Sequence, residues 1–320
     1  MALPTLRDVL RARRQIRDHL LVTPLHPAPG LSALVGTEVS VKHENHLPTG
    51  SFKVRGGVNL LAQLDPATRA RGVLAASTGN HGQSVAFAAQ LFGAPATVFV
   101  PEGANPVKVA AMRQLGATVI ATGVDFDDAR EACEARAAAT GARYIHSGDE
   151  PLLIAGVATH TLEILEQDPT VEVIVVPVGG GSGAAGACLA AKAVDPAITV
   201  IGVQSAAAPA AHRSWRQGTL VAAPMETFAE GLATRTAFAL PQRLLRAHLD
   251  DFVLVSDDAI RAAMLAMLEH ARTLCEAAGA APLAAALQLR ERLRGRRVAL
   301  ICSGGNVSPA QLRAVLGAGG

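Results

Sequence analysis

Aromatic side chains are scarce in this chain of 320 residues, where Phe, Tyr and Trp together make up 3%. Few rings are therefore present to stack on bases. No basic stripe compensates, because 29 Lys and Arg face 27 Asp and Glu for a net charge of +2. We expect no nucleic-acid partner. Hydrophobic residues make up 50% of the chain, which excludes a disordered protein and predicts a large core.

Cysteine is also rare. No two of the four cysteines form the CxxC pair of a metal or redox site, and four in 320 residues make no disulfide framework (Cys133, Cys188, Cys275 and Cys302). We therefore expect a reduced, cytoplasmic protein. The first 20 residues agree, because Asp8 and Asp18 interrupt the region where a secretory signal carries a continuous apolar run.

Long apolar runs are missing as well. The uncharged stretch 173–191 has 19 residues, close to the length of a membrane span, but Pro177 and five glycines interrupt it. This stretch predicts a buried strand, a Gly-rich turn and a helix of small residues. We expect no membrane partner.

Short β-branched runs alternate with helical patterns along most of the chain. The runs predict strands at 72–77, 96–101, 118–123, 144–147, 172–179, 199–205, 250–256 and 297–304. Helices are expected between several of them, at 80–93, 105–116, 125–141 and 156–167. Because the strands are apolar throughout, both of their faces should be covered. The alternation predicts an α/β fold with mostly parallel, twisted sheets flanked by helices.

Ligand sites in such folds lie at the carboxyl ends of strands, where Gly-rich turns meet helix N-termini. Three junctions have this character: STGNHG (77–82), VGGGSGAAG (178–186) and CSGGN (302–306). A fourth glycine-flanked segment is LPTGSFKVRGG (47–57). These four segments are the candidate site.

The junction at 178–186 predicts a phosphate-binding loop. Its glycines let backbone N–H groups approach an anion, and the helix that follows adds its positive end (Gly179, Gly180, Gly181 and Gly183). Ser182 can add a hydroxyl donor. The alternative, a tight turn needed only for helix–sheet packing, leaves three consecutive glycines unexplained.

The same loop contains GSGAAG, which satisfies the GxGxxG pattern of dinucleotide sites. A dinucleotide site also expects an acidic residue about 20 positions further on, for the ribose hydroxyls. Here the next strand ends at 202–205 (GVQS) without a carboxylate. An NAD-dependent oxidoreductase is therefore disfavoured, and the absence of GxxxxGK[ST] excludes a P-loop nucleotide site.

Lysine is the other scarce residue, with only four among the 29 basic side chains (Lys42, Lys53, Lys108 and Lys192). A lysine kept where arginine is the usual cation suggests chemistry that needs a primary amine, such as a Schiff base. Lys53 lies in the glycine-flanked segment 47–57. A Schiff-base lysine together with a phosphate loop predicts pyridoxal 5′-phosphate (PLP) as the cofactor.

Two further residues fit this cofactor. Asn80 opens a helix and can bond the phenolic oxygen of the ring, and Ser303 follows a strand and can face the pyridine nitrogen. A hydroxyl at that position leaves the nitrogen largely unprotonated, so the ring is a weaker electron sink. The pair therefore favours β-elimination over transamination.

Five motifs occur in a fixed order: ENHLPTGSFKVRGG, STGNHGQSVAFAA, PVGGGSGAAG, AEGLAT and CSGGNVS. With them the chain resembles the fold-type II PLP enzymes, in the serine/threonine dehydratase and serine racemase branch, from about residue 18 to 310. The resemblance implies the tryptophan synthase β-like architecture and a homodimer. It divides the chain into a large PLP-binding domain, 1–70 with 150–320, and a small α/β domain, 71–149.

The resemblance also implies roles for individual residues. Lys53 would hold PLP as a Schiff base and remove the substrate's Cα proton, with Phe52 along the ring and Gly231 close to it. A loop would bind the substrate carboxylate (Ser77, Thr78, Asn80 and His81). The implied reaction is β-elimination from a 3-hydroxy L-amino acid such as threonine or serine, giving a 2-keto acid and ammonia.

The chain departs from the family pattern at three places. Thr78 stands where many dehydratases have Ala and the racemases have an acid/base Ser, so racemisation with Thr78 as second base is an alternative. Gln204 replaces the Glu of a divalent-cation site, so we expect no metal. The chain ends 14 residues after Asn306, so we expect no C-terminal regulatory domain.

Other functions stay open at this point. A dehydratase for a bulkier 3-hydroxy amino acid, of the hydroxyectoine-pathway or phenylserine type, is one alternative. A non-catalytic ligand-binding relative is another, although the presence of both Lys53 and Ser303 argues against it.

Overall fold

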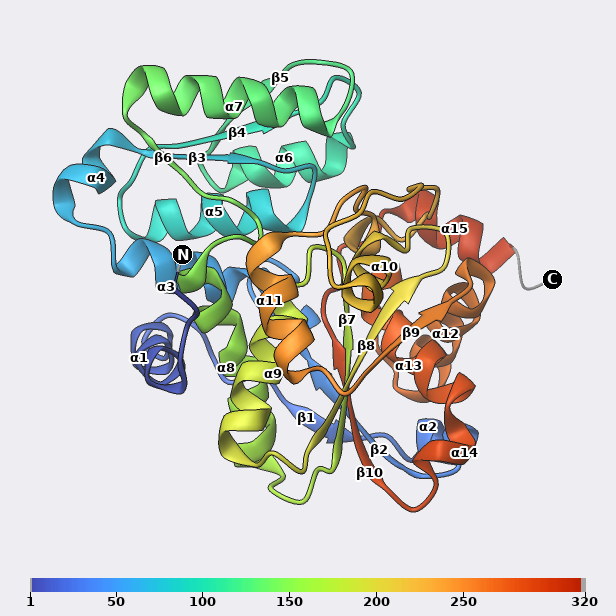
Figure 1. Ribbon diagram of the computed structural model, residues 1–320. Helices are drawn as coiled ribbons and strands as arrows, with labels where there is room; N and C mark the ends of the chain where they lie inside the picture. The colour runs from blue at the N-terminus through green and yellow to red at the C-terminus, as the bar shows by residue number, and fades with distance from the viewer. Residues whose placement is uncertain (1, 318–320) are drawn as a thin grey trace.

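The strands form two separate sheets in the computed structural model, which describes residues 2–317 (Figure 1). The larger sheet has the order β1-β2-β10-β7-β8-β9, with β1 (Leu25–Pro27), β2 (Glu38–His43), β7 (Val173–Pro177), β8 (Thr199–Ser205), β9 (Asp251–Val255) and β10 (Arg297–Cys302). The smaller sheet has the order β5-β4-β3-β6, with β3 (Val73–Ala76), β4 (Ala96–Val100), β5 (Thr118–Ala121) and β6 (Arg143–Tyr144). Neighbouring strands run parallel, except that β1 is antiparallel to β2.

Helices cover both faces of each sheet. Their bounds are α1 (Leu6–Ile16), α2 (Pro29–Val35), α3 (Lys53–Ala62), α4 (Pro66–Arg71), α5 (Asn80–Leu91), α6 (Pro106–Gln114), α7 (Phe126–Thr140), α8 (Pro151–Gln167), α9 (Ser182–Val194), α10 (Ala210–Gln217), α11 (Ala239–His248), α12 (Asp257–His270), α13 (Ala277–Gln288), α14 (Arg290–Leu293) and α15 (Pro309–Gly317), with 3₁₀ turns η1 (Glu44–His46) and η2 (Glu230–Leu232). None of the helices in residues 2–317 has the length and apolar content that crossing a bilayer requires.

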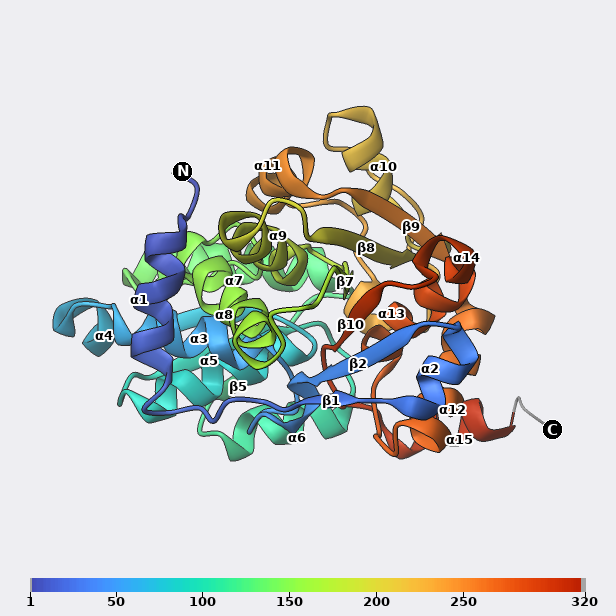
Figure 2. The same cartoon turned by 90° about the horizontal axis from the view of Figure 1, so that it is seen from below.

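The core follows from this layering. One face of the larger sheet packs against α2, α12 and α13, and the other against α8, α9 and α11. In the smaller sheet, α7 covers one face and α5 with α6 the other, as Figure 1 shows at the upper left. Seen from below in Figure 2, β1 and β2 run along the edge of the larger sheet, with α2 beside them.

The predicted α/β class with mostly parallel sheets flanked by helices is confirmed. The strand predicted at 144–147 is wrong in extent, because β6 ends at Tyr144. After one more sheet hydrogen bond, from Ile145 N–H to the Leu74 carbonyl (2.8 Å), the chain turns away. His146 closes that turn, since its Nδ1 accepts from the N–H groups of Gly148 and Asp149.

A buried ion cluster joins β2, η1, α3 and α8. The guanidinium of Arg55 in α3 donates to both carboxylate oxygens of Glu44 (2.6 and 2.8 Å) and to both of Glu163 (2.8 and 2.7 Å). Lys42 donates to Glu163 (2.8 Å) and to the carbonyl of Thr23 (2.7 Å). The four charged side chains are at most 1% exposed. Two cations and two anions therefore neutralise one another inside the protein.

Replacing Arg55 tests this cluster. Arg55→Ala leaves Glu44 and Glu163 buried with Lys42 as the only fully buried cation, beside the partly exposed Arg13 at 3.5 Å from Glu163, so we expect a loss of about 3 to 5 kcal/mol of stability, seen in urea unfolding. Arg14→Ala, at an exposed position of α1, is the matched control and should change stability by about 0.5 kcal/mol or less. A loss below about 1 kcal/mol for Arg55→Ala would contradict the interpretation.

Candidate active site

The carboxyl ends of β3, β7 and β10 meet at the start of α3. The Phe52 N–H donates to the Ser303 carbonyl (3.0 Å), which joins the lysine segment to the 302–306 motif. A Cβ placed on Gly183 would lie 3.0 Å from the Phe52 ring, and one on Gly179 would lie 2.2 Å from the Gly231 carbonyl oxygen. The structure thus brings the predicted cofactor-binding segments together.

Lys53 is the first residue of α3, and its backbone carbonyl accepts a hydrogen bond from Ser84 Oγ of α5 (2.6 Å). Its Nζ lies 5.6 Å from the centroid of the Phe52 ring. Burial lowers the pKa of this amine to about 8, and the Glu276 carboxylate opposes the shift only in part. A substantial fraction of Lys53 is therefore an uncharged, nucleophilic amine near neutral pH.

The loop between β7 and α9 has the form of an anion cradle. Gly181 caps α9 in the left-handed region (φ +93°) and brings no side-chain acceptor, so the first N–H groups of the helix stay available to an anion. A Cβ on Gly180 would lie 2.2 Å from the Phe238 ring, so glycine is required there by space. Ser182 is the first residue of α9 and is buried at this end. A phosphate group fits this donor set.

The loop after β3 and the first turn of α5 hold the four residues predicted to bind the substrate carboxylate. Ser77 Oγ accepts from the N–H groups of Gly79 (3.2 Å) and Gly82 (3.0 Å), so its hydroxyl orders the loop. Thr78 is exposed. His81 is buried, and its Nε2–H donates to the Ile145 carbonyl (3.0 Å). Burial, with Lys53 nearby, lowers the pKa of His81 to about 3, so its ring is neutral.

Asn80 is bound at both ends of its amide. Its Nδ2 donates to Glu276 Oε1 (2.7 Å), and its Oδ1 accepts from Asn306 Nδ2 (2.7 Å). Glu276 is buried at the start of α13, and burial raises the pKa of its carboxyl to about 7. Sequence reasoning missed Glu276. A signal existed, because Glu276 is the one charged residue between 273 and 288.

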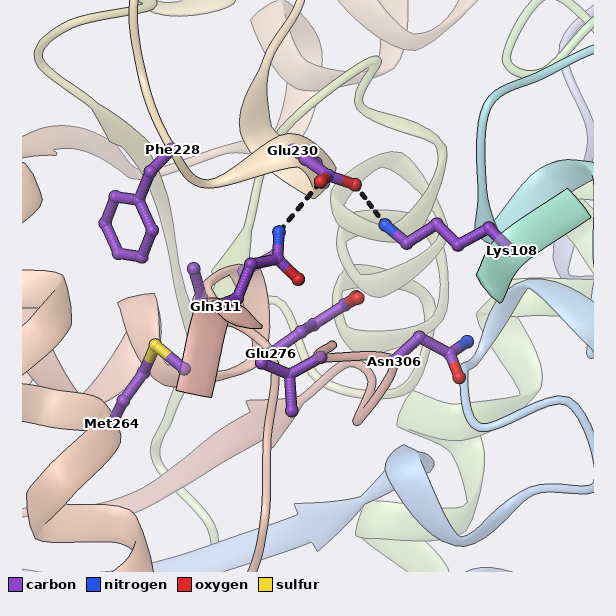
Figure 3. A pocket seen from close by; sticks show the side chains of 11 residues that line it. Lys108, Phe228, Glu230, Met264, Glu276, Asn306 and Gln311 are labelled. Atoms are coloured by element: carbon purple, nitrogen blue, oxygen red, sulfur yellow. Dashed lines mark hydrogen bonds and ion pairs between the residues drawn. The ribbon is translucent and has the colours of Figure 1, made fainter. Parts of the chain in front are cut away.

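A pocket beside Glu276 holds an ion pair between the two sheets' helical layers. Lys108 of α6 pairs with Glu230 of η2, whose other oxygen accepts from Gln311 Nε2 of α15 (2.8 Å). Figure 3 shows the Lys108, Glu230 and Gln311 side chains meeting above Glu276, with Asn306 at one side. Lys108 is one of the four lysines of the chain. The structure buries its side chain at the site.

Among residues 2–317, no group of three or more His, Cys, Asp or Glu side chains is placed to hold a metal ion. Gln204 is fully buried, and its Oε1 accepts from the His212 N–H (3.0 Å). This amide therefore serves a protein contact.

A buried, partly uncharged lysine beside a glycine cradle for phosphate, at the carboxyl edge of a parallel sheet, defines an enzyme class that binds a phosphorylated aldehyde cofactor. Comparison with known proteins identifies the same cofactor class. The model of the family described as "pyridoxal-phosphate dependent enzyme" matches residues 16–304. The chain belongs to this PLP-dependent family, and its structural neighbours place it among the fold-type II enzymes.

Individual relatives are similar along almost the whole length of this chain. An L-threonine ammonia-lyase of Thermotoga maritima is 40% identical over 98% of this chain and 79% of its own. An L-threo-3-hydroxyaspartate ammonia-lyase of Saccharomyces cerevisiae is 34% identical over 96% of this chain and 94% of its own. The crystal structure of serine racemase from Dictyostelium discoideum superposes with a TM-score of 0.91 at 33% identity, covering 96% of this chain and all of that one.

The buried amine of Lys53 should destabilise the cofactor-free protein in a pH-dependent way. The folded pKa of Lys53, about 8, lies below the ordinary 10.5. Above pH 10.5 the amine is neutral in both the folded and the unfolded chain and costs no stability. The folded protein then loses stability as pH falls through 8. Lys53→Met should therefore raise stability at pH 7 by roughly 2 to 3 kcal/mol in urea unfolding, and the gain should shrink by pH 10. Arg14→Met is the control. A gain independent of pH would contradict a buried, charged Lys53.

The cradle makes a separate prediction. Gly179→Ala forces a Cβ against the Gly231 carbonyl oxygen, so the loop must shift and the affinity for PLP should fall at least about tenfold. Titration of the cofactor-free protein, followed by visible absorbance, measures it. Gly317→Ala, where no atom lies within 4 Å of the new Cβ, should bind PLP like the parent chain. Equal affinities for the two variants would exclude the cradle from phosphate binding.

Proposed function

We propose that this chain catalyses β-elimination from a 3-hydroxy L-amino acid, such as threonine or serine, to a 2-keto acid and ammonium. The observation that carries the proposal is the buried Lys53 amine beside the glycine cradle of 179–183. The relatives named threonine and hydroxyaspartate ammonia-lyases support the choice of reaction.

When bound, PLP withdraws electrons from the amino acid joined to it and so acidifies the Cα–H bond. The residues supporting this cofactor are Phe52, Gly179, Gly180, Gly181, Ser182, Gly183, Gly231 and Ser303, with Asn80 at the ring's edge. Lys53 holds the cofactor through its amine. Once freed, the same amine accepts the Cα proton, and its lowered pKa increases the fraction of Lys53 that is basic and uncharged near neutral pH.

The loop of Ser77, Thr78, Asn80 and His81 orients the substrate. It lies at the N-terminus of α5, where unpaired N–H groups and the helix dipole favour a carboxylate. Because the His81 ring is neutral, it does not disfavour protonation of the nearby Lys53 amine. The β-hydroxyl then leaves as water, and the released unsaturated amine hydrolyses to a 2-keto acid and ammonium.

Racemisation is the second candidate. It needs a proton donor on the face of the substrate opposite Lys53, and Thr78 offers an exposed hydroxyl in the right loop. The structural similarity to a serine racemase supports considering it. A bulkier 3-hydroxy amino acid is the remaining substrate choice.

We also propose the organisation of the molecule. The smaller sheet, built between residues 73 and 144, supports a small domain of 71–149, with 1–70 and 150–320 as the large domain. A cytoplasmic location is supported by four free, buried cysteines. A homodimer stays a prediction that a mass measurement in solution can test.

A substrate panel tests the function. Purified protein with PLP is given L-serine, L-threonine, L-threo-3-hydroxyaspartate and phenylserine, and both 2-keto acid and D-isomer are measured. We expect keto acid from one L-substrate and a loss of at least about a thousandfold for Lys53→Ala. D-isomer without keto acid, abolished by Thr78→Ala, would replace the dehydratase by a racemase. Activity in neither assay would reject both.

A further inference from the structure

The orientation of the Asn80 amide follows from a backbone carbonyl. Asn306 Nδ2 donates to the Thr49 carbonyl (2.8 Å), which can only accept, so this end of the Asn306 amide is its NH₂ group. Its second hydrogen goes to Asn80 (2.7 Å), which must present Oδ1 there. The Asn80 NH₂ group therefore faces Glu276 (2.7 Å) and has one hydrogen left to donate.

Glu276 is held in place to receive this bond. It is the N-cap residue of α13, yet its side chain does not cap that helix. Its own N–H donates to the Gly304 carbonyl (3.0 Å), next to Ser303. A Cβ on Gly304 would lie 2.6 Å from Glu276 Oε1, and one on Gly231 would lie 3.7 Å from it. Gly304 thus leaves room that the carboxylate occupies, and Gly231 lies at ordinary contact distance from it.

The charges around Glu276 come from four other elements. Lys108 of α6 and Lys53 of α3 favour its ionised form, and Glu230 of η2 opposes it. Cys302 of β10 lies close enough for the carboxylate to raise the pKa of its thiol. Lys108 is already paired with Glu230 (Figure 3), so it only partly compensates the burial of Glu276.

We propose that Glu276 is a positioning residue for Asn80: its carboxylate holds the amide so that the remaining N–H points to the cofactor, and its ionisation sets the strength of that hold. The inference rests on the proposed function only in assigning Asn80 to the cofactor. A hydrogen bond to an ionised carboxylate is roughly twice as strong as one to a neutral group. The site thus gains a proton-dependent hold on PLP near neutral pH, where the Glu276 carboxyl titrates (pKa about 7).

A double-variant cycle tests the coupling. The affinity of the cofactor-free protein for PLP is measured at pH 8 for Asn80→Ala, Glu276→Ala and the double variant. We expect each single variant to lose about tenfold and the double variant to lose no more than about twofold beyond Asn80→Ala. Glu276→Gln keeps an acceptor for Asn80 and should stay within about threefold of the parent chain. If the two losses of PLP affinity multiply, so that the double variant binds PLP about a hundredfold more weakly than the parent chain, the proposal is overturned.

The pH dependence gives a readout that a neutral structural contact would not move. The folded pKa of Glu276 lies above its ordinary 4.5, so its contribution to stability is complete below pH 4.5 and is lost as pH rises through about 7. Between pH 5 and 8, the unfolding temperature of the cofactor-free parent should therefore fall relative to that of Glu276→Gln. Over the same range, PLP affinity should rise more steeply with pH in the parent.

Glu269→Gln, an exposed carboxylate on α12, is the matched control and should follow the parent in both measurements. Parallel curves for the parent and Glu276→Gln would overturn the role of ionisation. None of these measurements uses turnover. A chain that converts no substrate in the panel can still show the coupling, and an active chain can lack it, so the two proposals fail separately.

Discussion

The four-charge cluster around Arg55 is the constraint on which the site depends. Burying two carboxylates and two cations is favourable only if each stays paired, and the bidentate geometry of Arg55 to Glu44 and Glu163 meets that condition. Arg55 lies two residues after Lys53 in α3. Because Glu44 belongs to η1 and Glu163 to the distant α8, these two elements and α3 must take one arrangement before all four charges are compensated, and that arrangement places the Lys53 amine.

The surroundings of Lys53 differ from those of Arg55. Here burial is only weakly compensated: Glu276 is the single charged group that counteracts the desolvation of the Lys53 amine, and Glu276 is itself held partly neutral by burial. The protein therefore keeps a fully neutralised cluster two residues along α3 from an incompletely neutralised pair. The first is suited to holding position and the second to exchanging protons.

Much of this arrangement could be predicted from the sequence, because the motifs lie at strand ends. In a parallel sheet the carboxyl ends share one edge, so Lys53, Asn80, the 179–183 loop and Ser303 were expected to meet, and the structure places their segments together. The positions of most strands could be predicted from apolar runs. The early end of β6 could not, because it depends on a turn that the His146 ring closes.

What escaped prediction depends on contacts between residues far apart in the chain. Arg55 reads as one more arginine until Glu163, more than a hundred residues later, is known to face it. Lys108 and Glu230 belong to segments whose meeting only the packing of α6 against η2 decides. Glu276 was also missed, but it could have been predicted from the sequence alone, because a single carboxylate in an apolar stretch indicates a buried functional residue.

The order of strands in the larger sheet has a consequence for the way the chain is made. The strand β2 pairs directly with β10, which is synthesised about 250 residues later, whereas the strands β3 to β6 follow one another closely. At 5 to 20 residues per second, β2 waits roughly 13 to 50 s for its neighbour. During that interval β2 can pair only with β1, which precedes it in the chain, while the smaller sheet can already close. The larger sheet therefore closes only when synthesis of the chain is nearly complete.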